Sequence, residues 1–255
     1  MTMTTDFTAS QNPAFLRAYP EAALSGVSFE DVEVAFAVQV LGLVRPDSRV
    51  LDYGAGRGEW CEDRSRLRRE LQLLKGRCRE VVGCDVDEAV LLNPAVDCAD
   101  AIDPAQPLPY GDASFDLIVS RYVFEHVQDP RHTAAELLRV LKPGGWICAL
   151  TPNKWGYPAI GARLVSNRHH AKMIRRVQPG GRAAHDVFPT AYRLNTRRDL
   201  KASFGSGARV IVQRASGPPA YFFGNDLAFA LFSLVHKLQP RAFATALMAF
   251  VQKLP

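Results

Sequence analysis

Short apolar runs alternate with segments of helical periodicity along roughly the first 150 residues of the chain. Apolar residues recur at helical spacing over 28–43 and again after Pro130. The strand-like runs lie at 49–52, 81–84, 95–98, 115–120 and 146–150. Strands that alternate with helices in this order form a parallel, doubly wound sheet with right-handed crossovers. The pattern therefore predicts an α/β fold.

Capping residues mark where the helices begin. Ser28 and Asp31 have capping-box spacing before the first helix, and Asp129 precedes a proline at the first position of another. Residues 59–80 are rich in Arg, Glu and Leu and favour a helix on one sheet face. The glycine pair at 144–145 is expected to end the helix that follows Asp129.

Two stretches in the second half depart from this alternation. Residues 163–182 contain five Arg, one Lys and two His but no acidic residue. Such a stretch can bind a phosphate-bearing substrate, nucleic acid or an anionic membrane surface, or it can be a solvated loop. Residues 221–238 are apolar nearly all round. They fit a helix packed on the sheet, a cap over an apolar acceptor, or a contact with a membrane surface or a second copy.

The remaining C-terminal pattern completes a single domain over 1–255. Thr196 and Asp199 have capping-box spacing before a helix that ends near Gly205. Strand-like runs follow at 208–213 and 247–251. We expect a cofactor-binding core, a cationic substrate-side insertion and a C-terminal helix and strand completion, at 28–153, 154–195 and 196–255.

Composition adds few constraints. The 255 residues are 47% hydrophobic and 22% charged, with a net charge of +5, as in ordinary globular proteins. The five cysteines form no CxxC pair and no metal-ligand spacing, which suits a reducing compartment, and no metal site is expected. The polar N-terminus lacks a signal-peptide layout, and no apolar run approaches the ~20 residues of a membrane span. A cytoplasmic protein is predicted, with a position at the membrane surface as the alternative.

The most informative chemistry follows the first strand-like run. Gly54, Gly56 and Gly58 stand at alternate positions after 50–53. Glycines there let the backbone turn sharply out of a strand and approach a ligand closely. In a doubly wound sheet, ligands bind at the carboxyl ends of the strands. Here those ends have the polar residues Asp52, Asp85, Asp100 and Ser120. The sequence predicts a nucleotide-type cofactor site at this edge.

The acid at the first strand end narrows the choice of cofactor. A hydride-transfer enzyme would show GxGxxG, whereas this chain has Gly54-x-Gly56-x-Gly58. Asp52 would repel a pyrophosphate at short range. S-adenosylmethionine has no phosphate, and its ammonium, sulfonium and ribose groups are favourable near carboxylates. The charges therefore favour S-adenosylmethionine.

Four segments match a known family in its order: VLDYGAGRG at 50–58, VVGCDVD at 81–87, LPYGDASFDLIVSRYVFEHV at 108–127 and LKPGGWICALTPN at 141–153. With them, the chain resembles class I S-adenosylmethionine-dependent methyltransferases of the small-molecule type 11 (UbiE-like) kind. They span about two-fifths of the chain. The resemblance implies a Rossmann-like methyltransferase fold, with a mostly parallel seven-stranded sheet and helices on both faces.

The resemblance also implies cofactor contacts at matching positions. Residues on the first and fourth strand ends would hold the methionine portion. Asp85 would accept hydrogen bonds from the ribose hydroxyls, and Val86 would pack on the adenine. Asp100 and Ala101 would meet the adenine edge. The full implied set is Asp52, Gly54, Ala55, Gly56, Gly58, Asp85, Val86, Asp100, Ala101, Ser120, Arg121 and Tyr122.

Methyl transfer needs a base only if the acceptor must lose a proton. His126, after the fourth strand-like run, and His185 are candidate bases, and either can instead be a structural polar residue. Residues 185–196 are similar to a segment of bacterial methyltransferases associated with cell-surface glycan synthesis. Within that segment Tyr192 and Arg193 are expected to contact the substrate.

The sequence therefore favours an enzyme that methylates a small-molecule acceptor, with O-methylation of a glycan or lipid-linked intermediate as the leading hypothesis. A nucleic-acid or protein methyltransferase is the alternative. The chain lacks an Asn-Pro-Pro-Tyr-type motif, and its cationic stretch lacks the interleaved aromatics of single-strand binding surfaces. A non-catalytic S-adenosylmethionine-binding regulatory or scaffold protein is a further alternative, against which the intact glycines and Asp85 argue.

Overall fold

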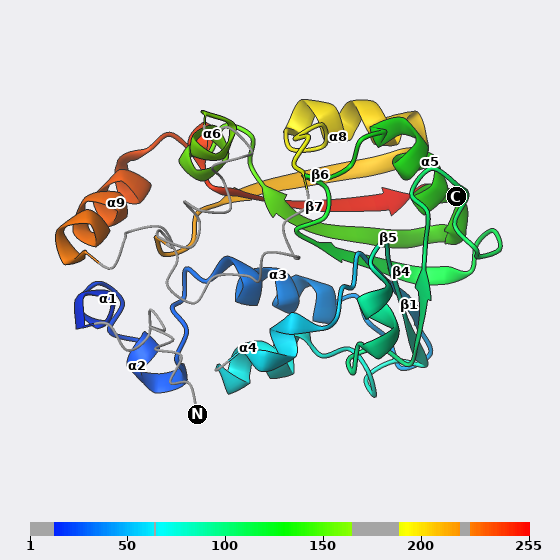
Figure 1. Cartoon of the computed structure of the whole chain (residues 1–255), viewed down its shortest axis with the longest axis horizontal. Helices are drawn as coiled ribbons and strands as arrows, with labels where there is room; N and C mark the ends of the chain where they lie inside the picture. Colours follow the sequence, from blue (N-terminus) through cyan, green and yellow to red (C-terminus); the bar gives the residue numbers. More distant parts are fainter. Residues whose placement is uncertain (1–12, 64, 165–188, 220–224) are drawn as a thin grey trace.

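Seven strands form one sheet in the computed structural model, which describes residues 13–63, 65–164, 189–219 and 225–255 (Figure 1). The strand order is β3-β2-β1-β4-β5-β7-β6. Neighbours from β3 to β5 pair in parallel, while β7 runs antiparallel to β5 and β6. The strands are β1 (Arg49–Tyr53), β2 (Glu80–Asp85), β3 (Cys98–Ala101), β4 (Phe115–Arg121), β5 (Leu141–Pro152), β6 (Ala208–Ala215) and β7 (Ala246–Lys253). The predicted doubly wound, mostly parallel sheet is confirmed.

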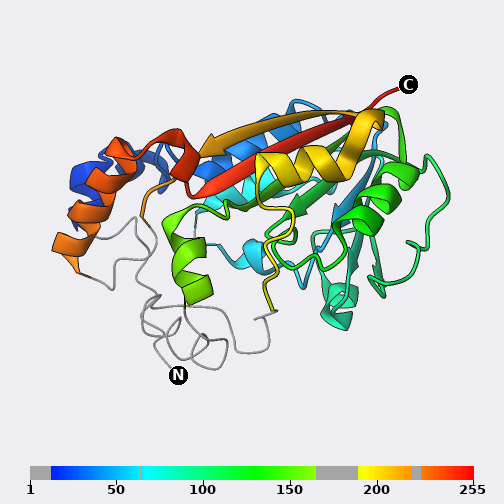
Figure 2. The same cartoon turned by 90° about the horizontal axis from the view of Figure 1, so that it is seen from above.

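Helices cover both faces of the sheet (Figures 1 and 2). One face packs against α3 (Val32–Leu41), with α4 (Arg66–Gln72) beside it, and the other packs against α5 (Pro130–Val140) and α8 (Arg197–Phe204). The remaining helices and 3-10 turns are α1 (Pro13–Ala18), α2 (Ala22–Ser25), η2 (Glu59–Glu62), η3 (Glu88–Leu92), α6 (Tyr157–Leu164), η5 (Gly205–Gly207), α9 (Asp226–Leu238) and η6 (Arg241–Phe243). Among the described helices, none is long and apolar enough to cross a membrane.

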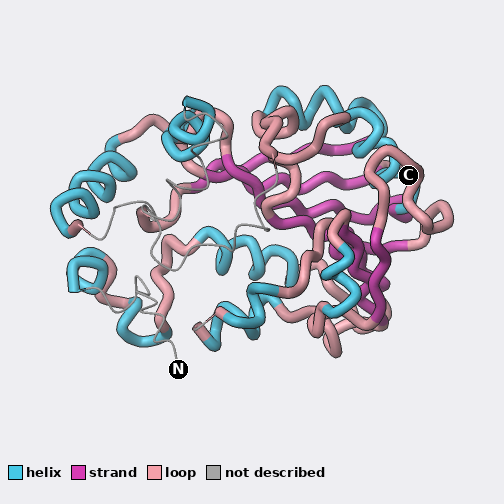
Figure 3. The backbone as a smooth tube through the Cα atoms, viewed as in Figure 1, coloured by secondary structure: helices cyan, strands magenta, loops and turns pink. Residues whose placement is uncertain are grey.

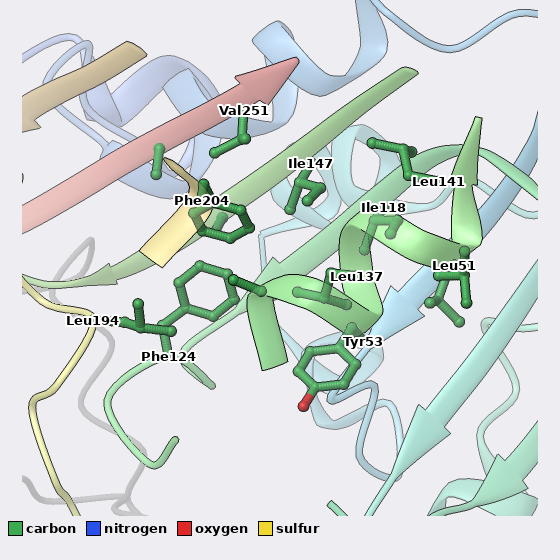
Figure 4. Packing of buried hydrophobic residues seen from close by; sticks show 14 of the residues in the cluster. Leu51, Tyr53, Ile118, Phe124, Leu137, Leu141, Ile147, Leu194, Phe204 and Val251 are labelled. Carbon is green, nitrogen blue, oxygen red and sulfur yellow. The ribbon is translucent and has the colours of Figure 1, made fainter. Parts of the chain in front are cut away.

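Side chains that alternate along the strands form two hydrophobic cores, one on each face of the sheet. Leu51 of β1 and Ile118 of β4 pack with Leu137 of α5 (Figure 4). Val50, one position earlier, packs with Phe36 of α3 on the opposite face. Because both faces are covered, the strands are apolar on both sides, as in other parallel sheets. By the same alternation, the side chain of Asp52, two residues after Val50, points toward α3.

The helix α9 packs away from the sheet, at one end of the molecule beside α1 (Figure 3). Phe229 lies 6.1 Å from Phe15 between ring centroids, and Phe232 stacks on Tyr157 of α6 at 5.1 Å. The expected apolar segment at 221–238 is thus a helix from Asp226, packed on α1 and α6 rather than on the sheet. Residues 221–224 lie outside the described residues.

The helix predicted over 59–80 is divided in two. Asp63 is extended and ends η2. The hydroxyl of Ser65 then caps α4 by accepting a hydrogen bond from Arg68 N at 3.3 Å, and Leu73, again extended, ends that helix. The break arises because a local side-chain cap competes with continued helix.

The glycine pair at 144–145 lies inside β5 and does not end a helix. The helix α5 already ends at Val140, because Leu141 is extended and pairs with Phe115 of β4. A Cβ on the second glycine would lie 2.8 Å from the carbonyl oxygen of Asp116. Glycine therefore lets β5 pass close to β4.

Two other boundaries shift by a few residues. The first predicted helix begins at Val32 because the Asp31 carboxylate, not Ser28, accepts the capping hydrogen bond, from Val34 N at 3.0 Å. The third strand covers 98–101 and not 95–98. The expected run includes Asp97, whose side chain bonds to the neighbouring strand: its carboxylate accepts a hydrogen bond from Val81 N of β2 at 2.8 Å. Regular strand pairing therefore begins only after Asp97.

Candidate active site

The turn after β1 brings three glycines to the carboxyl edge of the sheet. Gly54, Gly56 and Gly58 have φ of +76°, +53° and +78°, a region that residues with side chains adopt only at a cost. A Cβ on Gly54 would lie 2.1 Å from Cγ2 of Val123, whereas one on Gly56 would meet nothing within 4 Å. The turn therefore packs tightly against Val123 at Gly54, whereas the space beside Gly56 is open.

Asn93 holds this turn from behind. Its Nδ2 donates to the carbonyl oxygens of Ala55 and Gly56, both at 3.0 Å, and the residue is buried. The amides of Gly54 and Ala55 donate to Cys84 O at 2.7 and 3.1 Å. Our sequence analysis missed Asn93. The only signal was an Asn-Pro pair after an apolar turn, because the contact spans 38 residues of sequence.

Asp85, at the end of β2, is hydrogen-bonded to the glycine turn. Its Oδ2 accepts a hydrogen bond from Gly56 N at 2.8 Å, and its Oδ1 accepts one from Asp87 N at 3.0 Å. Each carboxylate oxygen has more than one lone pair. Asp85 can therefore position the turn and still accept hydrogen bonds from a ligand. The neighbouring Val86 is 48% exposed, as a side chain that covers a ligand requires.

Asp52 and Arg121 form an ion pair at the ends of β1 and β4. Nη2 of Arg121 lies 3.4 Å from Oδ2 of Asp52, and both side chains are largely buried. Burial raises the pKa of Asp52, and the guanidinium of Arg121 opposes that rise. Arg121 also donates to Gln72 and lies 5.0 Å from the ring centroid of Trp60. The acid that the sequence placed at this edge is therefore paired with a cation, and the edge is less negative than expected.

The adjacent strand end holds Asp100 and Ala101. These two residues pair with Cys84 and Asp85 of β2. The hydroxyl of Tyr110 donates to Oδ2 of Asp100 at 3.0 Å. Burial, followed by the charges of Cys84 and Asp100, raises the pKa of Tyr110, so the hydroxyl remains a donor. Tyr110 is a second residue that our sequence analysis missed.

The end of β4 has two further polar side chains. Ser120 is 1% exposed, and its Oγ has no hydrogen-bond partner among the described residues. Tyr122 has φ of +57° and donates through its hydroxyl to Glu33 of α3 at 3.2 Å. Burial and then Glu33 raise the pKa of Tyr122 well above its usual value. Tyr122 thus connects β4 to α3, while Ser120 retains an unused hydrogen-bonding group.

His126 contacts the segment that re-enters the described structure at Pro189. Its Nδ1 lies 3.0 Å from the carbonyl oxygen of Pro189, which can only accept, so the proton is assigned to Nδ1. Its Nε2 lies 4.0 Å from Oε1 of Glu125. The carbonyl oxygen of Glu125 accepts hydrogen bonds from the amides of Ala191 and Tyr192 at 2.6 and 3.0 Å.

A buried polar network extends from Glu125 across the strand ends. Thr151 of β5 donates to Oε2 of Glu125 at 2.9 Å, and Asn195 donates to Oγ1 of Thr151 at 2.7 Å. All three residues are at most 4% exposed. The network fixes the segment at 189–195 to the ends of β4 and β5. Glu125 was not among the sequence candidates.

The other predicted substrate-side residues, Tyr192 and Arg193, differ in their exposure to solvent. Tyr192 is buried at φ of +50°. Arg193 is exposed, donates to Gln128 O at 2.7 Å and lines an open cavity of about 430 Å³ between α5 and α8. His185 lies outside the described residues, as does the stretch 165–182.

Comparison with known proteins identifies the family of this chain. Residues 29–204 match the family described as "Methyltransferase domain", which is more than half of the chain. The chain belongs to this methyltransferase family. The resemblance to class I S-adenosylmethionine-dependent methyltransferases of the UbiE kind is thereby confirmed.

Curated relatives of the methyltransferase domain include a probable S-adenosylmethionine-dependent methyltransferase from Mycolicibacterium smegmatis, 34% identical over 41% of this chain and 38% of the relative. A ubiquinone/menaquinone biosynthesis C-methyltransferase UbiE from Ectopseudomonas mendocina is 30% identical over 49% of each. The chain spans less than half the length of these relatives. A crystal structure of an S-adenosylmethionine dependent methyltransferase from Mesorhizobium loti matches with TM-score 0.51 at 19% identity, covering 88% of this chain and 99% of that one, and supports the fold.

The methyltransferase fold thus gathers most predicted cofactor residues at one edge. The ends of β1, β2 and β4 are neighbours in the sheet, which places Asp52, Asp85 and Ser120 along that edge. The open side of the turn at Gly56, the spare lone pairs of Asp85 and the unused Oγ of Ser120 suit a cofactor with hydroxyl and ammonium donors. The residues present therefore fit S-adenosylmethionine.

Proposed function

We propose that this domain transfers the methyl group of S-adenosylmethionine to a small-molecule acceptor, by O-methylation of an anionic glycan or lipid-linked intermediate. The supporting observation is that the described residues on either side of the cation-rich segment (163–182) follow or contact the carboxyl ends of strands. At one end, α6 follows β5 directly. At the other, Pro189 is hydrogen-bonded to His126 after β4. The described residues on both sides of this segment are therefore anchored near the acceptor side, and its sequence supplies five Arg over 163–182.

We assign the cofactor contacts as follows. Asp85 accepts hydrogen bonds from the ribose hydroxyls, with Val86 against the adenine. Asp100, oriented by its hydrogen bond from Tyr110, meets the adenine edge together with Ala101. The backbone at 54–58 approaches the methionine portion at its glycines, which have no Cβ to obstruct it.

The methionine portion has charges of both signs, and the edge offers both. Asp52 is the partner for its ammonium, and Arg121 is the partner for its carboxylate. Both side chains are already held in place, Arg121 by Gln72 and Trp60. Such prior ordering reduces the entropy lost on binding. Ser120 supplies a further hydrogen bond.

For a hydroxyl acceptor, His126 is the proposed base. Its Nδ1 proton is committed to Pro189 O, so Nε2 has the lone pair that accepts a proton. The Glu125 carboxylate at 4.0 Å stabilises the imidazolium that results. The bound cofactor would supply a methyl group from its sulfonium, and the demethylated cofactor would be a neutral thioether. The acceptor oxygen forms the new bond to carbon as its proton passes to Nε2.

The test incubates the purified chain with methyl-labelled S-adenosylmethionine and a cell extract, and then fractionates the labelled product. Label in an organic-extractable or anionic glycan fraction supports the proposal. Label in nucleic acid or protein contradicts it. Binding of the cofactor without transfer to any fraction indicates a regulatory or scaffold protein instead.

His126→Gln is expected to lower kcat by about 10²-fold or more while leaving cofactor affinity unchanged. His132→Gln, on α5, is the matched control and should retain the full rate. An unchanged rate in His126→Gln shows that His126 is structural.

C-methylation is the second candidate, because relatives of this chain are named ubiquinone/menaquinone biosynthesis C-methyltransferases. The carbon chemical shift of the transferred methyl group distinguishes the two products. A methyl group bonded to oxygen supports the proposal, and a methyl group bonded to carbon supports this alternative.

A further inference from the structure

The helix α9 has apolar side chains on two opposite sides. On one side, Phe229 and Phe232 contact the aromatic rings of Phe15 and Tyr157. The other side is a stripe of leucines exposed by 82%, 60%, 53% and 74%, which are Leu227, Leu231, Leu234 and Leu238. Contiguous exposed apolar surface on a folded domain marks an interaction site.

The spacing of this leucine stripe indicates what covers it. Its members follow one another at intervals of four, three and four residues. At 3.6 residues per turn they occupy an arc of roughly 60° on the helix surface. Val235, which is 39% exposed, flanks the stripe on one side. Leucines at this spacing form the seam of a helix–helix pair. A helix that lies on a membrane has a strongly basic face beside its apolar one, whereas Lys237 is the only Lys or Arg of α9.

We propose that α9 pairs antiparallel with α9 of a second copy of this chain. A two-fold axis through the middle of the stripe makes the interface self-complementary. Leu231 then meets Leu234 of the partner subunit, and Leu227 meets Leu238 of the partner subunit. The inference does not depend on the methyltransferase activity.

The charges at the two ends of α9 select the antiparallel orientation. Asp226 is in the first turn and Lys237 in the last. On a helical projection both flank the leucine stripe on the same side. Antiparallel pairing brings each Asp226 near Lys237 of the partner subunit. Parallel pairing would place the two copies of this flank on opposite sides of the interface and would form no such ion pair. Asp226 also pairs with Arg17 at 3.5 Å, but that contact is highly exposed and weak.

The pairing is expected to be reversible. The 13 residues of α9 form a helix only about 20 Å long, so the interface is at the small end of specific interfaces. Sedimentation equilibrium of the full chain over a range of concentrations should therefore show a monomer–dimer equilibrium.

Leu231→Lys combined with Leu234→Lys should raise the dimer dissociation constant by about 100-fold or more. Both side chains are exposed, so thermal melts should show an intact fold. Leu254→Lys, which alters an exposed leucine outside α9, is the matched control and should leave the dissociation constant unchanged. Lys237→Asp should weaken the dimer by about two- to fivefold, and adding Asp226→Lys should reverse that loss.

Three results would overturn the proposal. The wild-type chain could be monomeric at every concentration, or its dimer could be insensitive to the paired lysine substitutions. A monomer that binds vesicles rich in phosphatidylglycerol, and loses that binding in the same leucine variant, would assign the stripe to a membrane surface instead.

Discussion

Replacing Arg121 with Met tests the buried ion pair beside the glycine turn. Nη2 of Arg121 lies 3.4 Å from Oδ2 of Asp52, and the two side chains are only 15% and 9% exposed. Removing one partner of a buried pair leaves the other charge without compensation, at a cost of about 3–5 kcal/mol. Arg121→Met should therefore lower the free energy of unfolding by about that amount in urea titrations near pH 8.

The loss should depend on pH, since Asp52 can take up a proton. Burial raises the folded pKa of Asp52 above its unfolded value, and without Arg121 that pKa rises further. A group with a raised folded pKa contributes its full stability below the unfolded pKa of about 3.9 and loses it as the pH rises through the folded pKa. The cost of Arg121→Met should therefore be larger near pH 8 than near pH 5.

Two further variants make this test decisive. Asp52→Asn in the Arg121→Met background should recover most of the loss, because an amide needs no counter-charge. Arg66→Met, which breaks an exposed pair with Glu70, is the matched control and should change stability by no more than about 1 kcal/mol. An Arg121→Met loss that is equal at the two pH values, and that Asp52→Asn does not relieve, would show that the variant leaves no uncompensated charge on Asp52.

Two other predictions concern stability. Gly54→Ala should destabilise the fold by about 1–3 kcal/mol more than Gly56→Ala in thermal melts, because only the former drives a Cβ into Val123, and equal losses would contradict this. Burial lowers the pKa of His236, against opposing effects of Gly217 and Glu30. Stability from that group is present above an unfolded pKa of about 6.5 and is lost as the pH falls through the folded pKa. His236→Gln should therefore lose less stability than wild type between about pH 7.5 and pH 5.5, and an equal loss would be the contrary result.

The hydrophobic pattern was sufficient to predict the sheet, because burial on both faces leaves uninterrupted apolar runs such as 146–150. It also predicted the cap at Thr196, whose hydroxyl accepts a hydrogen bond from Asp199 N at 3.0 Å. Boundaries failed where side chains compete for backbone groups, as at Ser65 in the middle of the expected helix over 59–80.

Only part of the candidate site could be predicted from the sequence. Glycines and strand-end acids occur in short motifs, so the turn and Asp85 could be recognised directly. The groups that hold them lie far away along the chain, as Asn93 does from Gly56 and Gln72 does from Arg121. Such partners are determined by tertiary packing and leave no local pattern. The same is true of Glu125, whose network depends on contacts with β5 and the segment after Pro189.

We propose that the carboxyl edge of the sheet binds S-adenosylmethionine through Asp85. Isothermal titration calorimetry on the full chain tests it directly, with Asp85→Ala as the variant and Asp103→Ala, an exposed aspartate, as the control. The wild type and the control should bind the cofactor alike. Asp85→Ala should weaken binding by at least about tenfold, since hydrogen bonds to a charged group contribute about 1.5–3 kcal/mol each. No binding by the wild type, or equal binding by Asp85→Ala, would show that Asp85 does not hold the cofactor at this edge.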